Sequence, residues 1–163
     1  MPRFRKILCP VDFDRNSLLA LRLAAELGRE GKGSLDIVHV LALPPGPEVS
    51  LPFGKMEATA RTRLERLARQ KVGDAVRYEV HVMMGDPGVE VLQTAKRLRS
   101  DLIVMATHGR KGLRHLILGS VAEYVIREAP CPVLTLRPKP VRRSQAVQKS
   151  RRPEAVRRSK EQS

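Results

Sequence analysis

The chain has 163 residues, of which 42% are apolar, so it is long and apolar enough for one ordinary domain with a buried core. Only 3% of the residues are aromatic and none is Trp, which disfavours a surface that stacks the bases of single-stranded nucleic acid. The net charge of +14 favours polyanionic partners.

Targeting and cysteine signals are weak. The N-terminus has no apolar run long enough for a signal peptide, and no segment reaches the roughly 20 apolar residues of a membrane span. Cys9 and Cys131 have neither the number for a disulfide framework nor the spacing of a zinc site, and we interpret them as small buried hydrophobic residues. We therefore expect a cytoplasmic protein without a metal site.

Strand-like and helix-like segments alternate along the chain. Strands are expected at residues 5–11, 35–41, 76–84, 101–107 and 132–137. Helical spacing of apolar residues falls between them, at residues 17–27, 55–71, 87–98 and 120–128. The run from Ile7 to Val11 is continuously apolar, which indicates a strand covered on both faces, whereas residues 76–84 alternate in polarity and suit an edge.

Particular residues mark the helix ends. The three glycines Gly28, Gly31 and Gly33 are expected to end the first helix. Asp86 suits the N-cap of the third helix, with Pro87 in its first turn. Before the last helix, Ser120 and Glu123 have the spacing of a capping box.

This alternation predicts a doubly wound α/β domain, a parallel sheet with helices on both faces. Such sheets bind ligands beyond the carboxyl ends of their strands, where the strand order switches. Four segments leave those ends, and all are rich in Gly, Pro or polar residues; they are residues 12–16, 42–54, 85–87 and 108–119.

The last part of the chain has a different composition. Residues 139–163 hold nine Lys and Arg against two Glu and have no aromatic residue. Such a segment cannot bury enough apolar surface to offset the entropy of ordering it, so we expect a domain at 1–138 followed by a disordered basic tail.

The stretch MATHGRKGLRHLILGS, residues 105–120, combines three glycines with basic side chains and ends before a helix. Free backbone amides at a helix N-terminus form a natural phosphate site, and Gly109 and Gly119 leave room for a ligand to approach. A surface turn closed by the capping box explains Ser120 and Glu123 equally well, so the residues alone leave both interpretations open. Of the histidines, His39 and His81 lie within strands and are interpreted as structural.

Taken together, KILCPVDFD, IVHV, GDP and DLIVMATHGRKGLRHLILGSVAEYVIREAPCPVLTL resemble the universal stress protein family over residues 3–137. Members that bind ATP carry Gly, two residues, Gly, nine residues, then Gly and Ser or Thr. Here the frame is Ala106, two residues, Gly109, nine residues, Gly119 and Ser120. The resemblance implies a Rossmann-like five-stranded sheet of order 3-2-1-4-5.

The resemblance also implies an ATP site across the first and fourth strands, where Mg²⁺ can accompany the nucleotide. Asp12 is then expected to hydrogen-bond the adenine, assisted by the Val40 backbone. Base and ribose contacts are expected from Pro10, Val11, Met105 and Ala106. The phosphates are expected to lie against Gly109, Arg110, Gly119, Ser120 and Val121. His108 is also expected to contact the nucleotide, because it follows the end of a strand.

Two positions depart from the family pattern. Ala106 replaces a glycine, and an alanine there is strained by roughly 1–2 kcal/mol if the backbone requires a positive φ. Asp14 stands where the family usually has Ser, and its carboxylate repels phosphates unless Arg15, Arg110 or Mg²⁺ offsets the charge.

Two functions from different classes are consistent with these features. The first is an ATP-binding stress or regulatory protein without fast catalysis, dimeric as the family usually is, through residues 133–136. The alternative is an ATP-free interaction module whose basic tail binds nucleic acid or an acidic partner, by neutralising phosphates without reading bases.

Overall fold

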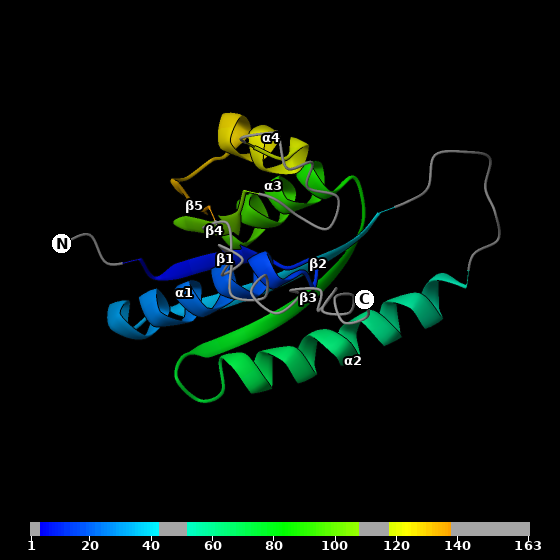
Figure 1. Ribbon diagram of the computed structural model, residues 1–163, viewed down its shortest axis with the longest axis horizontal. Helices are drawn as coiled ribbons and strands as arrows, with labels where there is room; N and C mark the ends of the chain where they lie inside the picture. Colours follow the sequence, from blue (N-terminus) through cyan, green and yellow to red (C-terminus); the bar gives the residue numbers. More distant parts are fainter. Residues whose placement is uncertain (1–3, 43–51, 108–117, 138–163) are drawn as a thin grey trace, which may run out of the picture.

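A five-stranded parallel sheet forms the centre of the molecule (Figure 1). The computed structural model describes residues 4–42, 52–107 and 118–137. The elements in chain order are β1 Lys6–Pro10, α1 Arg15–Gly31, β2 Ser34–Ala42, α2 Phe53–Lys71, β3 Arg77–Gly85, α3 Pro87–Leu98, β4 Leu102–Ala106, α4 Ser120–Glu128 and β5 Val133–Leu136. The strand order is β3-β2-β1-β4-β5, which confirms the predicted doubly wound topology.

The helices form two layers, with α1 and α2 on one face of the sheet and α3 and α4 on the other (Figure 1). Successive side chains of a strand point to opposite faces, so β1 contributes to two cores. Ile7 and Cys9 pack with residues of α1 and α2, whereas Leu8 packs with residues of α3 and α4. All three are fully buried, as the continuous apolar run predicts.

β3 and β5 are the two edge strands of the sheet. β3 pairs only with β2 among the described strands, over nine residues, and its alternating polarity reflects this edge position. β5 forms the opposite edge and pairs with β4 from Val133 to Leu136. The expected tail at residues 139–163 lies outside the described residues.

The first helix is longer than predicted at both ends. It begins at Arg15 because Asp14 caps it, its side chain accepting a hydrogen bond from the Asn16 amide. It continues through Gly28 to Gly31, and the left-handed residue that ends it is Lys32, with φ of 54°. The helix therefore ends at Gly31, one of the predicted glycines, but it passes through Gly28, and the residue with positive φ is Lys32 and not a glycine.

Close packing explains the two glycines around this helix end. A Cβ at Gly31 would lie 2.6 Å from the Phe4 carbonyl oxygen, and one at Gly33 would lie 2.7 Å from the same atom. Both distances are shorter than a carbon atom can approach an oxygen. The glycines thus allow the segment before β1 to cross the end of α1.

The predicted N-cap is confirmed for α3 and is wrong for α4. α3 begins as predicted, with Pro87 at its start and the Asp86 carboxylate accepting from the Val89 amide at 3.0 Å. α4 begins at Ser120, but its N-cap is Gly119, whose backbone carbonyl accepts from the Glu123 amide. Ser120 is already helical, so it does not occupy the cap position that a capping box requires.

Candidate functional site

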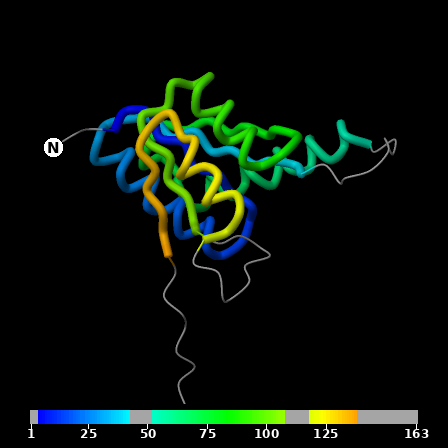
Figure 2. The backbone as a smooth tube through the Cα atoms, turned by 90° about the horizontal axis from the view of Figure 1, so that it is seen from above, coloured from blue at the N-terminus to red at the C-terminus, as the bar shows by residue number. Residues whose placement is uncertain are grey.

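The carboxyl ends of β1 and β4 lie side by side, because these two strands are parallel neighbours at the centre of the sheet. The strand order switches between them, since β2 lies on one side of β1 and β4 on the other. Figure 2 shows the starts of α1, in blue, and of α4, in yellow, at the same end of the strands. Ligands of doubly wound sheets bind at such a switch point.

Short hydrogen bonds shape the loop that follows β1. The Asp12 carboxylate accepts from the Asp14 amide at 3.0 Å, and the Asp12 amide donates to the Ser17 hydroxyl oxygen at 3.3 Å. The Ser17 hydroxyl in turn donates to the Asp14 carbonyl at 2.9 Å. Asp12 is half-buried and is held at the end of β1 by this compact turn.

The residues expected around the base occupy different environments. Pro10 and Val40 are half-buried, on adjacent strands, and Pro10 pairs in register with Val38. Val11 is 3% exposed and packs in the core beside α1, while Met105 is 4% exposed and packs in the core beside α3. Their side chains therefore belong to the cores, and only their backbones remain to border the switch point.

Ala106 is a regular strand residue. It is the last residue of β4 and pairs in register with Leu136. Positive φ among the described non-glycine residues occurs only at Phe13, Lys32 and Arg99. The backbone strain that a glycine would relieve is therefore absent at Ala106.

Thr107 brings the two ends of the glycine-rich segment together. Its carbonyl accepts from the Gly119 amide at 2.7 Å, so this hydrogen bond joins the two ends of the segment. Its own amide and hydroxyl both donate to the Leu136 carbonyl, at 3.0 and 3.2 Å. The sequence analysis missed this role, because a threonine at a strand end carries no distinctive signal.

The N-terminus of α4 directly follows Gly119, the donor of this hydrogen bond. Gly119 has extended backbone angles, φ −77° and ψ 153°, and has no side chain with which to cap the first turn. The amides of Ser120 and Val121 belong to the turn whose N–H groups have no partner within a helix. Ser120 is exposed and Val121 half-buried. Gly109 and Arg110, also expected at the phosphates, and His108, expected to contact the nucleotide, lie outside the described residues.

His39 has a further role at this end of the sheet that the sequence did not reveal. Its Nδ1 lies 2.7 Å from the Val11 carbonyl oxygen, and this hydrogen bond joins β2 to the residue before Asp12. The interpretation of His39 as a structural residue is consistent with this contact. A lone histidine within a strand gave no means of identifying its partner.

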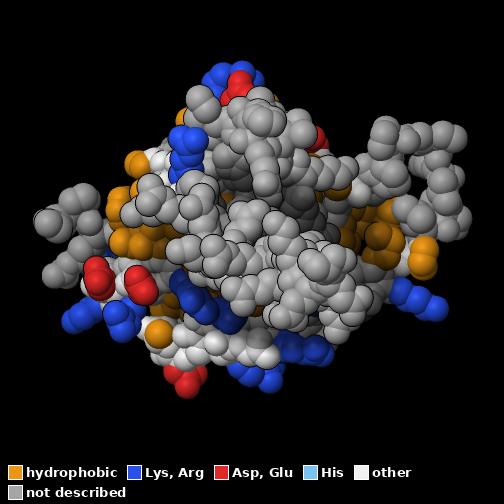
Figure 3. Space-filling view, in the orientation of Figure 1, with side chains coloured by type: hydrophobic (Ala, Val, Ile, Leu, Met, Phe, Trp, Pro, Cys, Tyr) orange, Lys and Arg blue, Asp and Glu red, His pale blue; other side chains and the backbone are white. Residues whose placement is uncertain are grey.

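Positive charge is also concentrated on α2. α2 carries six Lys and Arg against two Glu, and Figure 3 shows basic side chains along the lower side of the molecule, where α2 lies. Among the arginines of α2, Arg63 lies with its guanidinium carbon 4.0 Å from the centre of the Phe13 ring.

No helix within the described residues combines the length and apolar character needed to cross a membrane.

The model of the universal stress protein family matches residues 3–137 of this chain. A universal stress protein A homologue of Coxiella burnetii is 33% identical over 141 residues, which cover 82% of this chain and 96% of the relative. A universal stress protein of Methanocaldococcus jannaschii is 31% identical over 142 residues, which cover 82% of each chain.

Solved structures share the fold. Universal stress protein UspA from Lactobacillus plantarum superposes with a TM-score of 0.75 at 24% identity, covering 84% of this chain and all of its own. A universal stress protein in complex with cAMP has a TM-score of 0.65 at 19% identity, covering 83% and 98%. One from Archaeoglobus fulgidus in complex with dAMP has a TM-score of 0.61 at 24% identity, covering 83% and 100%.

Proposed function

The chain belongs to the universal stress protein family, and we propose that it is a regulatory protein that binds ATP, with Mg²⁺, at the switch point between β1 and β4. Two structurally similar family members were solved with adenine nucleotides, cAMP and dAMP, which supports this ligand class. The observation that carries the proposal is the glycine-capped start of α4 at the same end of the strands as the Asp12 loop.

The two halves of this site suit the two halves of a nucleotide. Asp12 offers a half-buried acceptor for the adenine amino group, and the Val40 backbone lies on the next strand. The first-turn amides of α4 offer donors and a positive helix end to the phosphates. In this assignment Pro10, Val11, Met105 and Ala106 border the base and ribose, and His108, Gly109, Arg110, Gly119, Ser120 and Val121 hold the phosphates.

We propose binding without fast catalysis. A general base needs an acceptor within reach of the attacking water. Both carboxylates of the β1 loop already accept backbone amide protons, Asp12 from Asp14 and Asp14 from Asn16. Each carboxylate can still accept further hydrogen bonds, so the proposal rests on their positions: Asp12 is assigned to the adenine, away from the phosphates, and Asp14 caps α1, which favours a switch over a hydrolase.

A dimer through β5 is part of the proposal. Leu134 on this edge strand is 39% exposed and Ile126 on α4 is 45% exposed, so large apolar side chains remain open to solvent there. Edge strands of this kind favour an isologous contact with a second copy. The hydrogen bonds from Thr107 to Leu136 link the start of the glycine-rich segment to this edge strand. Nucleotide occupancy can therefore alter the dimer surface.

The test is calorimetric titration of the full chain with Mg²⁺-ATP, with GTP and tripolyphosphate as comparison ligands. We expect one micromolar site per chain for ATP and weaker binding of the other two, because only ATP fits Asp12 and the amides together. Asp12→Ala and Gly119→Val should each abolish ATP binding. Asp74→Ala, an exposed carboxylate in the turn after α2, is the matched control and should bind as the parent does.

Two results would overturn the site. One is equal affinity for ATP, GTP and tripolyphosphate, which indicates attraction to positive charge alone. The other is unchanged ATP affinity in both site variants. Either result would favour the alternative, an ATP-free module whose basic tail binds an anionic partner, and that binding should weaken steeply with salt and disappear on deletion after Pro138.

A further inference from the structure

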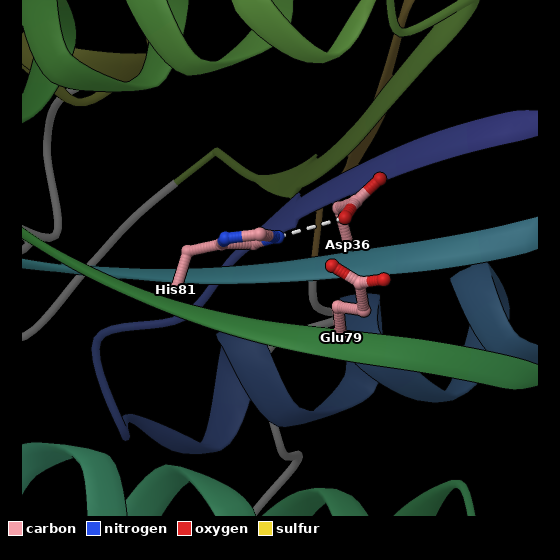
Figure 4. Close-up of side chains that lie close together, drawn as sticks. All are labelled: Asp36, Glu79 and His81. Carbon is pink, nitrogen blue, oxygen red and sulfur yellow. Dashed lines mark hydrogen bonds and ion pairs between the residues drawn. The ribbon is translucent and has the colours of Figure 1, made fainter.

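Three potential metal ligands meet on the strand pair β2–β3, away from the proposed nucleotide site. Asp36 is the third residue of β2 and Glu79 the third of β3, and the two are direct partners in the strand register. His81 follows two residues after Glu79 on the same face of β3. Figure 4 shows all three side chains on the side of the strands turned away from α1 and α2.

The three groups converge within coordination reach of one cation. One ligand atom from each residue lies within 4.8 Å of those of the other two. His81 Nε2 lies 2.8 Å from Asp36 Oδ1, and the two side chains are 16% and 12% exposed. Glu79 is exposed and forms the open side of the cluster, through which an ion can enter.

The charges of the cluster are poorly balanced without a cation. Like charges directly opposite each other on neighbouring strands destabilise a sheet, and Asp36 and Glu79 hold such positions. His81 offsets one carboxylate when it is protonated. The side chain of Glu79 has no hydrogen bond or ion pair with any residue in the described parts of the chain. A divalent cation would neutralise both carboxylates at once.

From this geometry we propose that Asp36, Glu79 and His81 form a binding site for a divalent transition metal, with Zn²⁺ as the best fit. One imidazole nitrogen and two carboxylate oxygens are ligands that Zn²⁺ accepts at about 2.0–2.2 Å, with a water in the fourth position. Tetrahedral ligands at that distance lie about 3.3 Å apart. The 2.8 Å between His81 Nε2 and Asp36 Oδ1 therefore needs to open by only about half an ångström.

The site is separate from the proposed nucleotide site. Asp36 and Glu79 lie near the amino ends of β2 and β3 and His81 lies at the middle of β3, whereas the nucleotide site lies beyond the carboxyl ends of β1 and β4. Metal binding would clamp the edge strand β3 to β2 and stabilise the fold in proportion to ion concentration. His81, interpreted from the sequence as structural, then acts as a ligand as well.

The experiment is calorimetric titration of the full chain with ZnCl₂, free of nucleotide and in a buffer that does not bind metal. We expect one saturable equivalent of Zn²⁺ from this site. Glu79→Gln should lower the affinity at least tenfold, and His81→Gln should abolish this site. His115→Gln, a histidine elsewhere in the chain, is the matched control.

Glu79→Gln is the deciding variant because the Glu79 side chain is exposed and has no hydrogen bond or ion pair with the described residues, so the fold should tolerate the change. The melting temperature measures the same site independently, since Zn²⁺ should raise it in the parent and in H115Q and much less in E79Q. The proposal is overturned if the parent shows no saturable binding. It is equally overturned if E79Q and H81Q both bind Zn²⁺ as tightly as the parent.

Discussion

The ring of Phe13 packs against the imidazole of His39, with their centroids 4.5 Å apart and their planes tilted by 51°. Phe13 adopts a φ of 64°, a left-handed conformation that is unfavourable for a bulky residue. The same ring faces Arg63 of α2, and His39 is bonded to the Val11 carbonyl. These contacts hold the strained residue that lies between Asp12 and Asp14.

The strain at Phe13 predicts an unusual order of stability for two variants. Phe13→Gly and Phe13→Ala lose the same ring contacts, but only glycine accepts a positive φ without steric cost. We expect the glycine variant to be the more stable by about 1 kcal/mol in urea unfolding. The control pair Thr59→Gly and Thr59→Ala, on the exposed side of α2, should show the opposite order. An alanine variant at 13 as stable as the glycine variant would contradict the strained backbone.

Asp14 predicts a separation of stability from nucleotide affinity. It caps α1, and serine is an equally good cap, so Asp14→Ser should change the unfolding free energy by less than about 0.5 kcal/mol, whereas Asp14→Ala should cost about 1 kcal/mol. Removing the carboxylate should tighten Mg²⁺-ATP binding several-fold in both variants, and more at low salt than at high salt. Calorimetry at two salt concentrations measures this. Weaker ATP binding in D14S would instead make Asp14 a ligand of the bound Mg²⁺.

Local sequence patterns were enough to predict the alternation of strands and helices, and the family resemblance added the strand order. Apolar or alternating runs mark the strands and helical periodicity marks the helices, and both signals can be recognised without knowing which elements pack together. Helix ends were less predictable. Gly31, the last residue of α1, and Gly33, just beyond it, are explained by the Phe4 carbonyl that packs against them and not by the ending of the helix.

The candidate site divides in the same way. The Asp12 loop and the start of α4 could be located because each is a short continuous segment, although the cap of α4 is Gly119 and not Ser120. The bond from Thr107 to Leu136 and the meeting of Asp36 with His81 could not, since both depend on strand register between residues distant in the chain. Strand pairing sets these contacts, and no local pattern records them.

The apolar edge predicts a dimer that one charge can dissociate. Leu134→Asp places a carboxylate in the proposed interface opposite its own copy, and we expect the dissociation constant to rise at least tenfold. Sedimentation equilibrium measures the change directly. Leu19→Asp is the matched control, because Leu19 is exposed to the same degree, 38% against 39%, but lies on α1. A parent chain that sediments as a monomer, or an L134D variant that stays dimeric, would rule out this interface.

Burial of Cys9 predicts a specific dependence of stability on pH. The thiol is fully buried in β1, and burial raises its pKa far above the ordinary value of 9.0. In the unfolded chain the thiol ionises near that ordinary value, so above it the unfolded state holds fewer protons than the folded state. The stability associated with this thiol is therefore fully present below about pH 9 and is lost as the pH rises further.

Comparison of the parent with Cys9→Ala isolates this effect. At neutral pH the variant should be less stable, because it leaves a small cavity in the core. Above about pH 9 the parent should lose up to about 1.4 kcal/mol per pH unit more than the variant, so the gap narrows. Urea unfolding between about pH 7 and pH 10.5 measures both curves. Cys131→Ala is the control. The pKa of Cys131 is also raised, by burial and by the Asp101 carboxylate, but that thiol is only partly buried and should give the smaller change in slope. Parallel curves for the parent and C9A would show that Cys9 ionises in the folded state, contrary to its position in β1.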